Sequence, residues 1–276
     1  MMRRLNLWAG VLILAVLVGG AVLAPFLPLA GPFDQRLEER LAPPGPGGWL
    51  GRDSKGRDLL SRVVHGAQIS LAVGLVTVGI SAAAGLLIGA LSGYLGGIVD
   101  EALMRLTDIF LAFPGILLAF ALMAILGPGL QNVILALCVM GWVGYARLVR
   151  AQVLALKEED YIAAARSLGG GTLRVIVRHL LPNVLAPVLV EATFGVASAI
   201  LAEAGLSFLG LGTQPPTPSW GTILKEGHLR LFEAPHLSFF PGLAIMLTVL
   251  GFNLFGDGLR DILDPGMRAA KRSGGR

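Results

Sequence analysis

The feature that most constrains this chain is an uncharged run from Ile109 to Ala146. As a single helix, these 38 residues would be about 57 Å long, nearly twice the roughly 30 Å of a bilayer's hydrocarbon core. The sequence Gly127-Pro128-Gly129 interrupts the run, and such a pattern is typical of a turn. We therefore predict two membrane-spanning helices joined by a tight turn at residues 127–129.

The composition favours a membrane as the solvent. Hydrophobic residues make up 54% of the chain and charged residues only 14%, whereas soluble domains average roughly 25% charged residues. So few charges cannot cover a water-facing surface, but lipid solvates an apolar exterior. The 38 glycines and 16 prolines are also tolerated in membrane helices.

Four more apolar segments are long enough to cross a bilayer: residues 5–33, 69–91, 184–211 and 234–256. A cleaved signal peptide is the alternative for the first, with Val22-Leu23-Ala24 as its processing site. Its apolar stretch exceeds the 7–15 residues of a signal core, and Pro25 is unfavourable after a cut, so we expect an uncleaved helix. The fold class predicted is an all-α integral membrane protein with about six transmembrane helices.

Loop charges predict the orientation. Fourteen Lys and Arg lie on segments that are inner if the N-terminus is cytoplasmic, and eight lie on the outer segments. With an even number of spans, we expect both Met1 and Arg276 in the cytoplasm.

We divide the chain into two parts. Residues 1–66 form the first helix and an outer loop, and residues 67–276 form a five-span domain with an inner loop over residues 150–183. The bias explains the net charge of +4 without a nucleic-acid partner.

The motifs of several enzyme classes are missing. The chain has no HExxH, GxSxG, CxxC or GxxxxGK[ST] pattern, and its four histidines are not at metal-ligand spacing. We predict no catalytic residue, metal or cofactor, and expect any hydrolysis that drives the protein to occur on another chain.

Two acids lie in the span over residues 184–211. An acid in a span is costly and normally faces the bundle interior or water. Glu203 is the better candidate for lining a passage, with a buried structural hydrogen bond as an equal alternative; Glu191 lies nearer the inner border. Proton carriage by Glu203 and Glu191 in a secondary transporter is the alternative function.

Smaller patterns predict helix contacts. Gly85, Gly89 and Gly93 share a helix face, where we favour packing within the chain over a homodimer seam. Arg105 and Asp108, three residues apart, are expected to pair.

The inner loop predicts two short helices at an angle. The acids of residues 158–160 suit a helix N-terminus, and residues 161–168 favour a helix. The glycines of residues 169–171 end it, and Thr172 can cap a second helix that stops before Pro182. This knuckle would project into the cytoplasm.

The same loop resembles the cytoplasmic "EAA" loop of ABC importer permeases. The matching residues are Asp160, Tyr161, Ala164, Ala165, Gly169, His179 and Pro182. Ala163 departs from the pattern, since many members have Glu there, but the dipeptide, oligopeptide and nickel branch often lacks that acid.

Further matches extend over nearly the whole chain. An outer-loop segment, Leu50 to Arg62, is similar to a segment of this branch, and its motif residues are Asp53, Gly56, Arg57, Asp58 and Arg62. The other matching segments are residues 108–118, 202–210, 216–221, 240–242 and 253–265. Within the branch, the chain is most similar to the second permease subunit of dipeptide systems. We expect the Arg and Asp residues of the outer motif to pair locally.

The resemblance implies a set of partners in a bacterial inner membrane. They are a related permease that completes a heterodimer, two cytoplasmic ATPase subunits, and an extracytoplasmic solute-binding protein. The loop over residues 160–182 would dock on an ATPase subunit, whose closure would alternate access to a central passage. Because the binding protein selects the solute, dipeptides, oligopeptides, nickel and glutathione all stay open.

Overall fold

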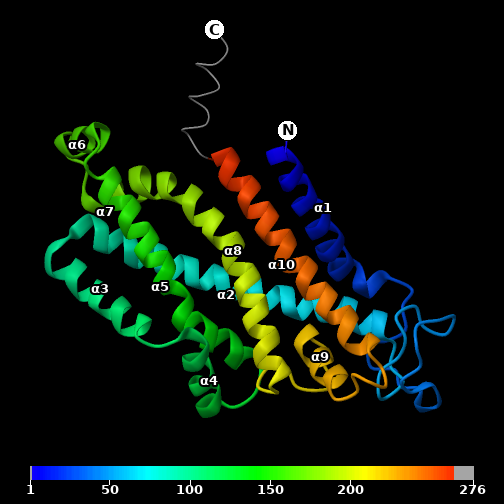
Figure 1. Cartoon of the computed structure of the whole chain (residues 1–276). Helices are drawn as coiled ribbons and strands as arrows, with labels where there is room; N and C mark the ends of the chain where they lie inside the picture. The colour runs from blue at the N-terminus through cyan, green and yellow to red at the C-terminus, as the bar shows by residue number, and fades with distance from the viewer. Residues whose placement is uncertain (1, 264–276) are drawn as a thin grey trace, which may run out of the picture.

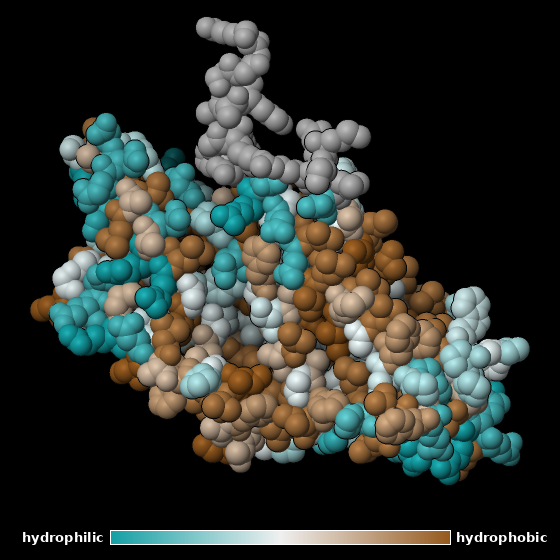
Figure 2. All heavy atoms as spheres, viewed as in Figure 1, coloured by the Kyte–Doolittle hydropathy of each residue, from teal (hydrophilic) through white to brown (hydrophobic). Residues whose placement is uncertain are grey.

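The computed structural model describes residues 2–263, and within this range it is built from helices without a named strand. Five helices are long and apolar enough to cross a membrane, and a bent pair can supply a sixth. Hydrophobic residues cover the middle of the molecule and hydrophilic residues gather at its two ends (Figure 2). The predicted fold class is confirmed. The predictions for Met1 and for residues 264–276 lie outside the described residues.

The first two spans are α1 (Met2–Leu23) and α2 (Leu59–Leu95). Helix α2 begins ten residues earlier than the apolar pattern predicts, because the Asp58 carboxylate accepts a hydrogen bond from the Ser61 backbone N–H at 2.8 Å and caps the helix. It ends at Gly96, whose φ is +66°. The boundary that we placed between residues 66 and 67 therefore falls inside a helix.

The third span is broken. Helices α3 (Gly97–Leu111) and α4 (Gly115–Leu126) meet at an angle of 82°. Pro114 lies at the break, where it lacks an N–H and disfavours a helical conformation at the preceding residue. The span that we predicted from Ile109 to the turn is therefore not one continuous helix but parts of two helices. Arg105 pairs with Glu101, at 2.9 Å, and not with Asp108.

The predicted turn at residues 127–129 is confirmed. Gly127 and Gly129 have φ values of +80° and +155°, a conformation that glycine adopts without strain. The Asn132 side chain donates to the carbonyl of Leu126 at 2.9 Å and so satisfies the end of α4. The fourth span, α5 (Leu130–Leu156), follows.

The inner loop starts as predicted and ends differently. Helix α6 (Asp160–Ser167) is separate, and α7 (Thr172–Val175) continues through a π-helical turn (Ile176–Leu180) into α8 (Leu181–Phe208). Pro182 does not stop the helix, because it lies in the first turn of α8, where a missing N–H costs little. Thr172 provides no cap, since Gly171 holds that position without a side-chain bond.

Helix α2 lies at the centre and packs against α5 and α8, while α1 lies along α10 (His236–Leu263) (Figure 1). The packing predicted for Gly85, Gly89 and Gly93 is confirmed, since all three face α5. A Cβ added at Gly93 would lie 3.0 Å from that of Val153. A short helix, α9 (Trp220–His228), which the apolar pattern did not predict, precedes α10.

Candidate functional site

Helix α6 projects at one end of the molecule (Figure 1), where hydrophilic residues gather (Figure 2), and we call this end the α6 end. Among the residues of α6, only Ile162 is buried. The Arg166 guanidinium lies 4.9 Å from the centre of the Tyr94 ring, at the end of α2. Because of this contact, a displacement of α6 would act on the end of α2.

The predicted loop residues are spread over three elements: Asp160, Tyr161, Ala164 and Ala165 are in α6 and Gly169 follows it, whereas His179 is in the π-helical turn and Pro182 in the first turn of α8. Asp160, Tyr161 and Ala164 are exposed, and the Tyr161 hydroxyl accepts a hydrogen bond from Asn183 at 3.4 Å. Further along, the His179 carbonyl also accepts from the Asn183 side chain, at 2.6 Å. Asn183, in the first turn of α8, thus connects Tyr161 of α6 with His179 of the π-helical turn.

Two glycines end α6 for different reasons. Gly169 has a φ of +82° and open space around its Cα. Gly170 has an ordinary φ, but an added Cβ would lie 2.6 Å from the Ala165 carbonyl oxygen, to which the Gly170 N–H donates at 3.0 Å. The sequence singled out Gly169; close backbone approach makes Gly170 equally constrained.

Large apolar side chains are exposed beside these glycines. Leu168 is 89% exposed and Leu173 is 74% exposed. Leu168 directly follows α6, and Leu173 lies in α7, at the start of the apolar helical stretch over residues 172–208. Both side chains therefore leave apolar surface uncovered beside α6.

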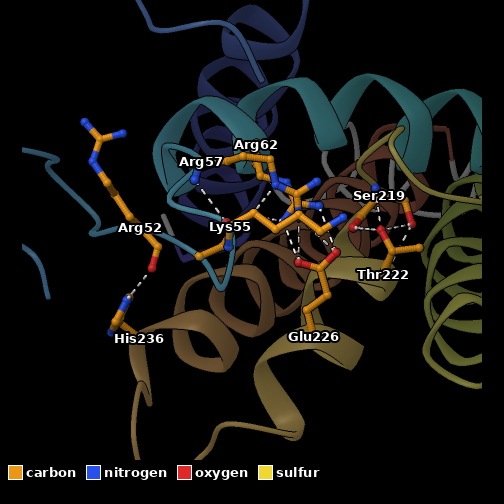
Figure 3. A network of polar contacts seen from close by, with 9 residues as sticks. Arg52, Lys55, Arg57, Arg62, Ser219, Thr222, Glu226 and His236 are labelled. Atoms are coloured by element: carbon orange, nitrogen blue, oxygen red, sulfur yellow. Dashed lines mark hydrogen bonds and ion pairs between the residues drawn. The ribbon is translucent and has the colours of Figure 1, made fainter. Parts of the chain in front are cut away.

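The opposite end, which we call the α9 end, carries a buried charge cluster (Figure 3). The Asp53 carboxylate accepts from Arg57 Nε at 2.6 Å and from Arg62 Nη1 at 2.5 Å. Glu226 of α9 accepts from the same two arginines, at 3.0 and 2.7 Å. The local pairing predicted for Asp53, Arg57 and Arg62 is confirmed. Sequence reasoning missed Glu226, whose only signal was its position as an acid in an outer segment.

The other two outer-motif residues shape the backbone. Asp58 caps α2 and joins no ion pair of the described structure. Gly56 has a φ of +72°, and an added Cβ would collide with the carbonyl of Arg36. The motif therefore builds a compact loop that leads into α2.

Glu203 is fully buried between α2 and α8. Its carboxylate accepts from Ser207 at 2.6 Å and from Ser70 at 3.0 Å. Of the two roles left open for this acid, the structure supports the buried hydrogen bond, because Glu203 does not line the cavity described next.

A cavity of about 430 Å³ lies between α2, α4, α5 and α8. Glu191 is on its wall, together with Tyr145 and Ser198. Thr77 and Ser81 complete the polar part of the lining. The sequence suggested Glu203 for such a lining, but Glu191, twelve residues earlier, occupies it.

These features define a class of protein: a helical membrane subunit with a mainly apolar cavity among its spans, a few polar groups on the wall of that cavity, and a separate structure at each hydrophilic end. Such an arrangement suits transport. The chain belongs to the family described as "Binding-protein-dependent transport system inner membrane component", whose model matches residues 85–269. It is thus a permease subunit of an ABC importer, as the inner loop and outer motif predicted.

Curated relatives support the same family. The chain is 44% identical over 260 residues to the dipeptide transport system permease protein DppC of Alkalihalophilus pseudofirmus, covering 94% of this chain and 86% of that one. It is 47% identical over 268 residues to a putative peptide transport system permease protein of Brucella suis, covering 97% and 90%. It is 50% identical over 217 residues to the glutathione transport system permease protein GsiD of Escherichia coli, covering 79% and 72%.

A solved structure shares the fold. A chain of the MetNI methionine ABC transporter, solved in inward-facing conformations, superposes with a TM-score of 0.58 at 22% identity, covering 75% of this chain and 98% of that one.

Proposed function

We propose that this chain is one of two related permease subunits that together form the passage of a peptide importer. Its partners would be the second permease, two cytoplasmic ATPase subunits and an extracytoplasmic solute-binding protein. Relatives named for dipeptide, peptide and glutathione transport support the solute class, since each of these solutes contains a peptide bond.

The observation that carries the ATPase contact is the exposed apolar surface next to α6. Leu168 and Leu173 have no covering neighbour within the described chain, and burying each on a partner would contribute about 1.5–3 kcal/mol. The Arg166–Tyr94 contact offers a path from that surface to α2. We therefore assign α6 and Leu168 to the docking site of an ATPase subunit.

This assignment orients the molecule. The α6 end would be cytoplasmic, and the α9 end, with Phe232 fully exposed, would face the binding protein. Helix α1 begins and α10 ends on the side of α6 (Figure 1), which supports cytoplasmic termini.

Matched variants at the two ends test the proposal. Leu168→Asp and Gly169→Asp should abolish co-purification of the ATPase subunits and reduce peptide uptake at least tenfold, because both place a charge on the apolar surface next to α6. Phe232→Asp makes the same chemical change at the other end and should leave ATPase co-purification intact. Normal co-purification and normal uptake in the Leu168 and Gly169 variants, at matched permease levels, would refute the docking role.

A further inference from the structure

The cavity between the spans contains hydroxyl groups without partners. Thr77, Ser81 and Tyr145 all line it and are each at least nine-tenths buried. Their three hydroxyl oxygens have no hydrogen-bond partner among the described residues. A buried hydroxyl without a partner is costly, so three of them around one cavity indicate a ligand that supplies the missing hydrogen bonds.

Two glycines keep these hydroxyls clear. A Cβ added at Gly141 would lie 3.0 Å from Ser81 Cβ and still closer to its hydroxyl. A Cβ added at Gly195 would collide with the Tyr145 hydroxyl. Both glycines also line the cavity, and larger residues there would fill the space in which a ligand must lie.

Glu191 supplies the charge of this cavity. Its side chain is exposed and forms no ion pair or hydrogen bond with the described residues. No Lys or Arg is among the lining residues of the described chain. An unpaired carboxylate in an apolar span is expensive, and a cation in the cavity would offset that cost.

We propose that the cavity binds the primary ammonium group of a peptide in transit. Three hydroxyl oxygens and a carboxylate are acceptors, and an ammonium group carries three N–H donors and one positive charge. The apolar remainder of the wall, which includes Ile116, Leu137 and Met140, would contact side chains of varied shape without specifying them. This inference deepens the proposed function and rests on it.

One other source of an ammonium group is a lysine of the partner permease. That lysine would occupy the cavity permanently, whereas a peptide occupies it only when present. The two sources therefore differ in whether a reagent reaches the cavity of the assembled importer in the absence of peptide.

Cysteine labelling in the assembled importer tests the proposal. The native thiol is removed by Cys138→Ala, and Ser198→Cys places a thiol on the exposed part of the cavity wall. Rates are compared for aminoethyl methanethiosulfonate, a primary ammonium, and its neutral methyl analogue. The same reagents on Gln214→Cys, exposed at the α9 end, give the intrinsic ratio of the two rates.

We expect the ammonium reagent to be favoured at Ser198→Cys by at least about fivefold over that intrinsic ratio, because the Glu191 carboxylate on the same cavity wall attracts a positive reagent and not a neutral one. Glu191→Gln should remove this preference, and Tyr145→Phe should reduce it. Alanylalanine should slow labelling, and its desamino analogue, propionylalanine, should not.

Three results would overturn the proposal. The first is the same preference for the ammonium reagent in the Glu191→Gln variant as with Glu191 present. The second is equal slowing of labelling by alanylalanine and by propionylalanine. The third is a thiol at position 198 that is labelled in the isolated chain but never in the assembled importer. The last result would assign the cavity to the partner permease. Uptake of alanylalanine by the wild-type importer, measured in parallel, tests the peptide function separately.

Discussion

Arg62, in the first turn of α2, and Glu226, on α9, lie 164 positions apart in the sequence and are joined by hydrogen bonds of 2.7 and 3.2 Å. Asp53 shares the same guanidinium from the outer loop. Two carboxylates and two arginines thus hold three separate segments together at the α9 end (Figure 3). The two negative and two positive formal charges of the cluster cancel, which suits a structural role better than solute binding.

Asp53→Asn should destabilise the fold by about 3–5 kcal/mol, because it leaves two buried arginines with one carboxylate. Asp53 and both arginines are each at most 2% exposed at the side chain. The measurement is thermal or denaturant unfolding of the purified protein in detergent.

Glu233→Gln is the matched control for this change. Glu233 also pairs with an arginine, Arg230, at 2.8 Å, but the two side chains are 55% and 41% exposed. Such a pair is worth about 0–1 kcal/mol. Equal stability losses in the Asp53 and Glu233 variants would argue against a structural role for the buried cluster.

Gly89→Ala should destabilise the contact between α2 and α5 by about 1–3 kcal/mol. The added methyl would lie 2.8 Å from Val149 Cβ and would collide with the Ala146 carbonyl. Gly79→Ala changes the same helix where nothing lies within 4 Å, and it should be neutral or stabilising by up to about 1 kcal/mol. Unfolding of the two variants side by side checks this, and similar behaviour of both would contradict the close packing.

Reporter fusions at Pro46 and at Arg276 should give opposite results for a reporter that is active only outside the cytoplasm. Pro46 lies in the loop at the α9 end, which we assign to the outer side. The fusion at Arg276 should be inactive because we place the C-terminus in the cytoplasm. The same result at both positions would rule out the six-span arrangement.

Most of the helical framework could be predicted, because long apolar runs and the Gly127-Pro128-Gly129 turn act locally. The errors arose where tertiary context decides. Pro182 was predicted to end a helix, but α7 runs on through a π-helical turn into α8, which begins just before Pro182. Pro114 reads as part of a span, but it breaks one by 82°.

The site was predictable in part for the same reason. The inner loop and the outer motif are each one contiguous segment of the sequence, so a sequence pattern could identify them. The cavity combines residues of four helices, and which acid of α8 reaches it depends on rotation of the helix. Glu203 points toward Ser70 of α2, and Glu191 lies on the cavity wall; spacing alone does not distinguish them.

Glu203→Gln should leave peptide uptake within about twofold of wild type. The amide can still bond to Ser70 and Ser207, whose hydroxyls can turn to donate or accept. Ser207→Ala, in contrast, leaves one buried carboxylate oxygen without its 2.6 Å donor and should cost about 1–3 kcal/mol of stability. Uptake and thermal unfolding, measured on both variants at matched levels, separate stability from transport. A severe loss of uptake in stable Glu203→Gln would instead place this carboxylate in the transport step and contradict its structural assignment.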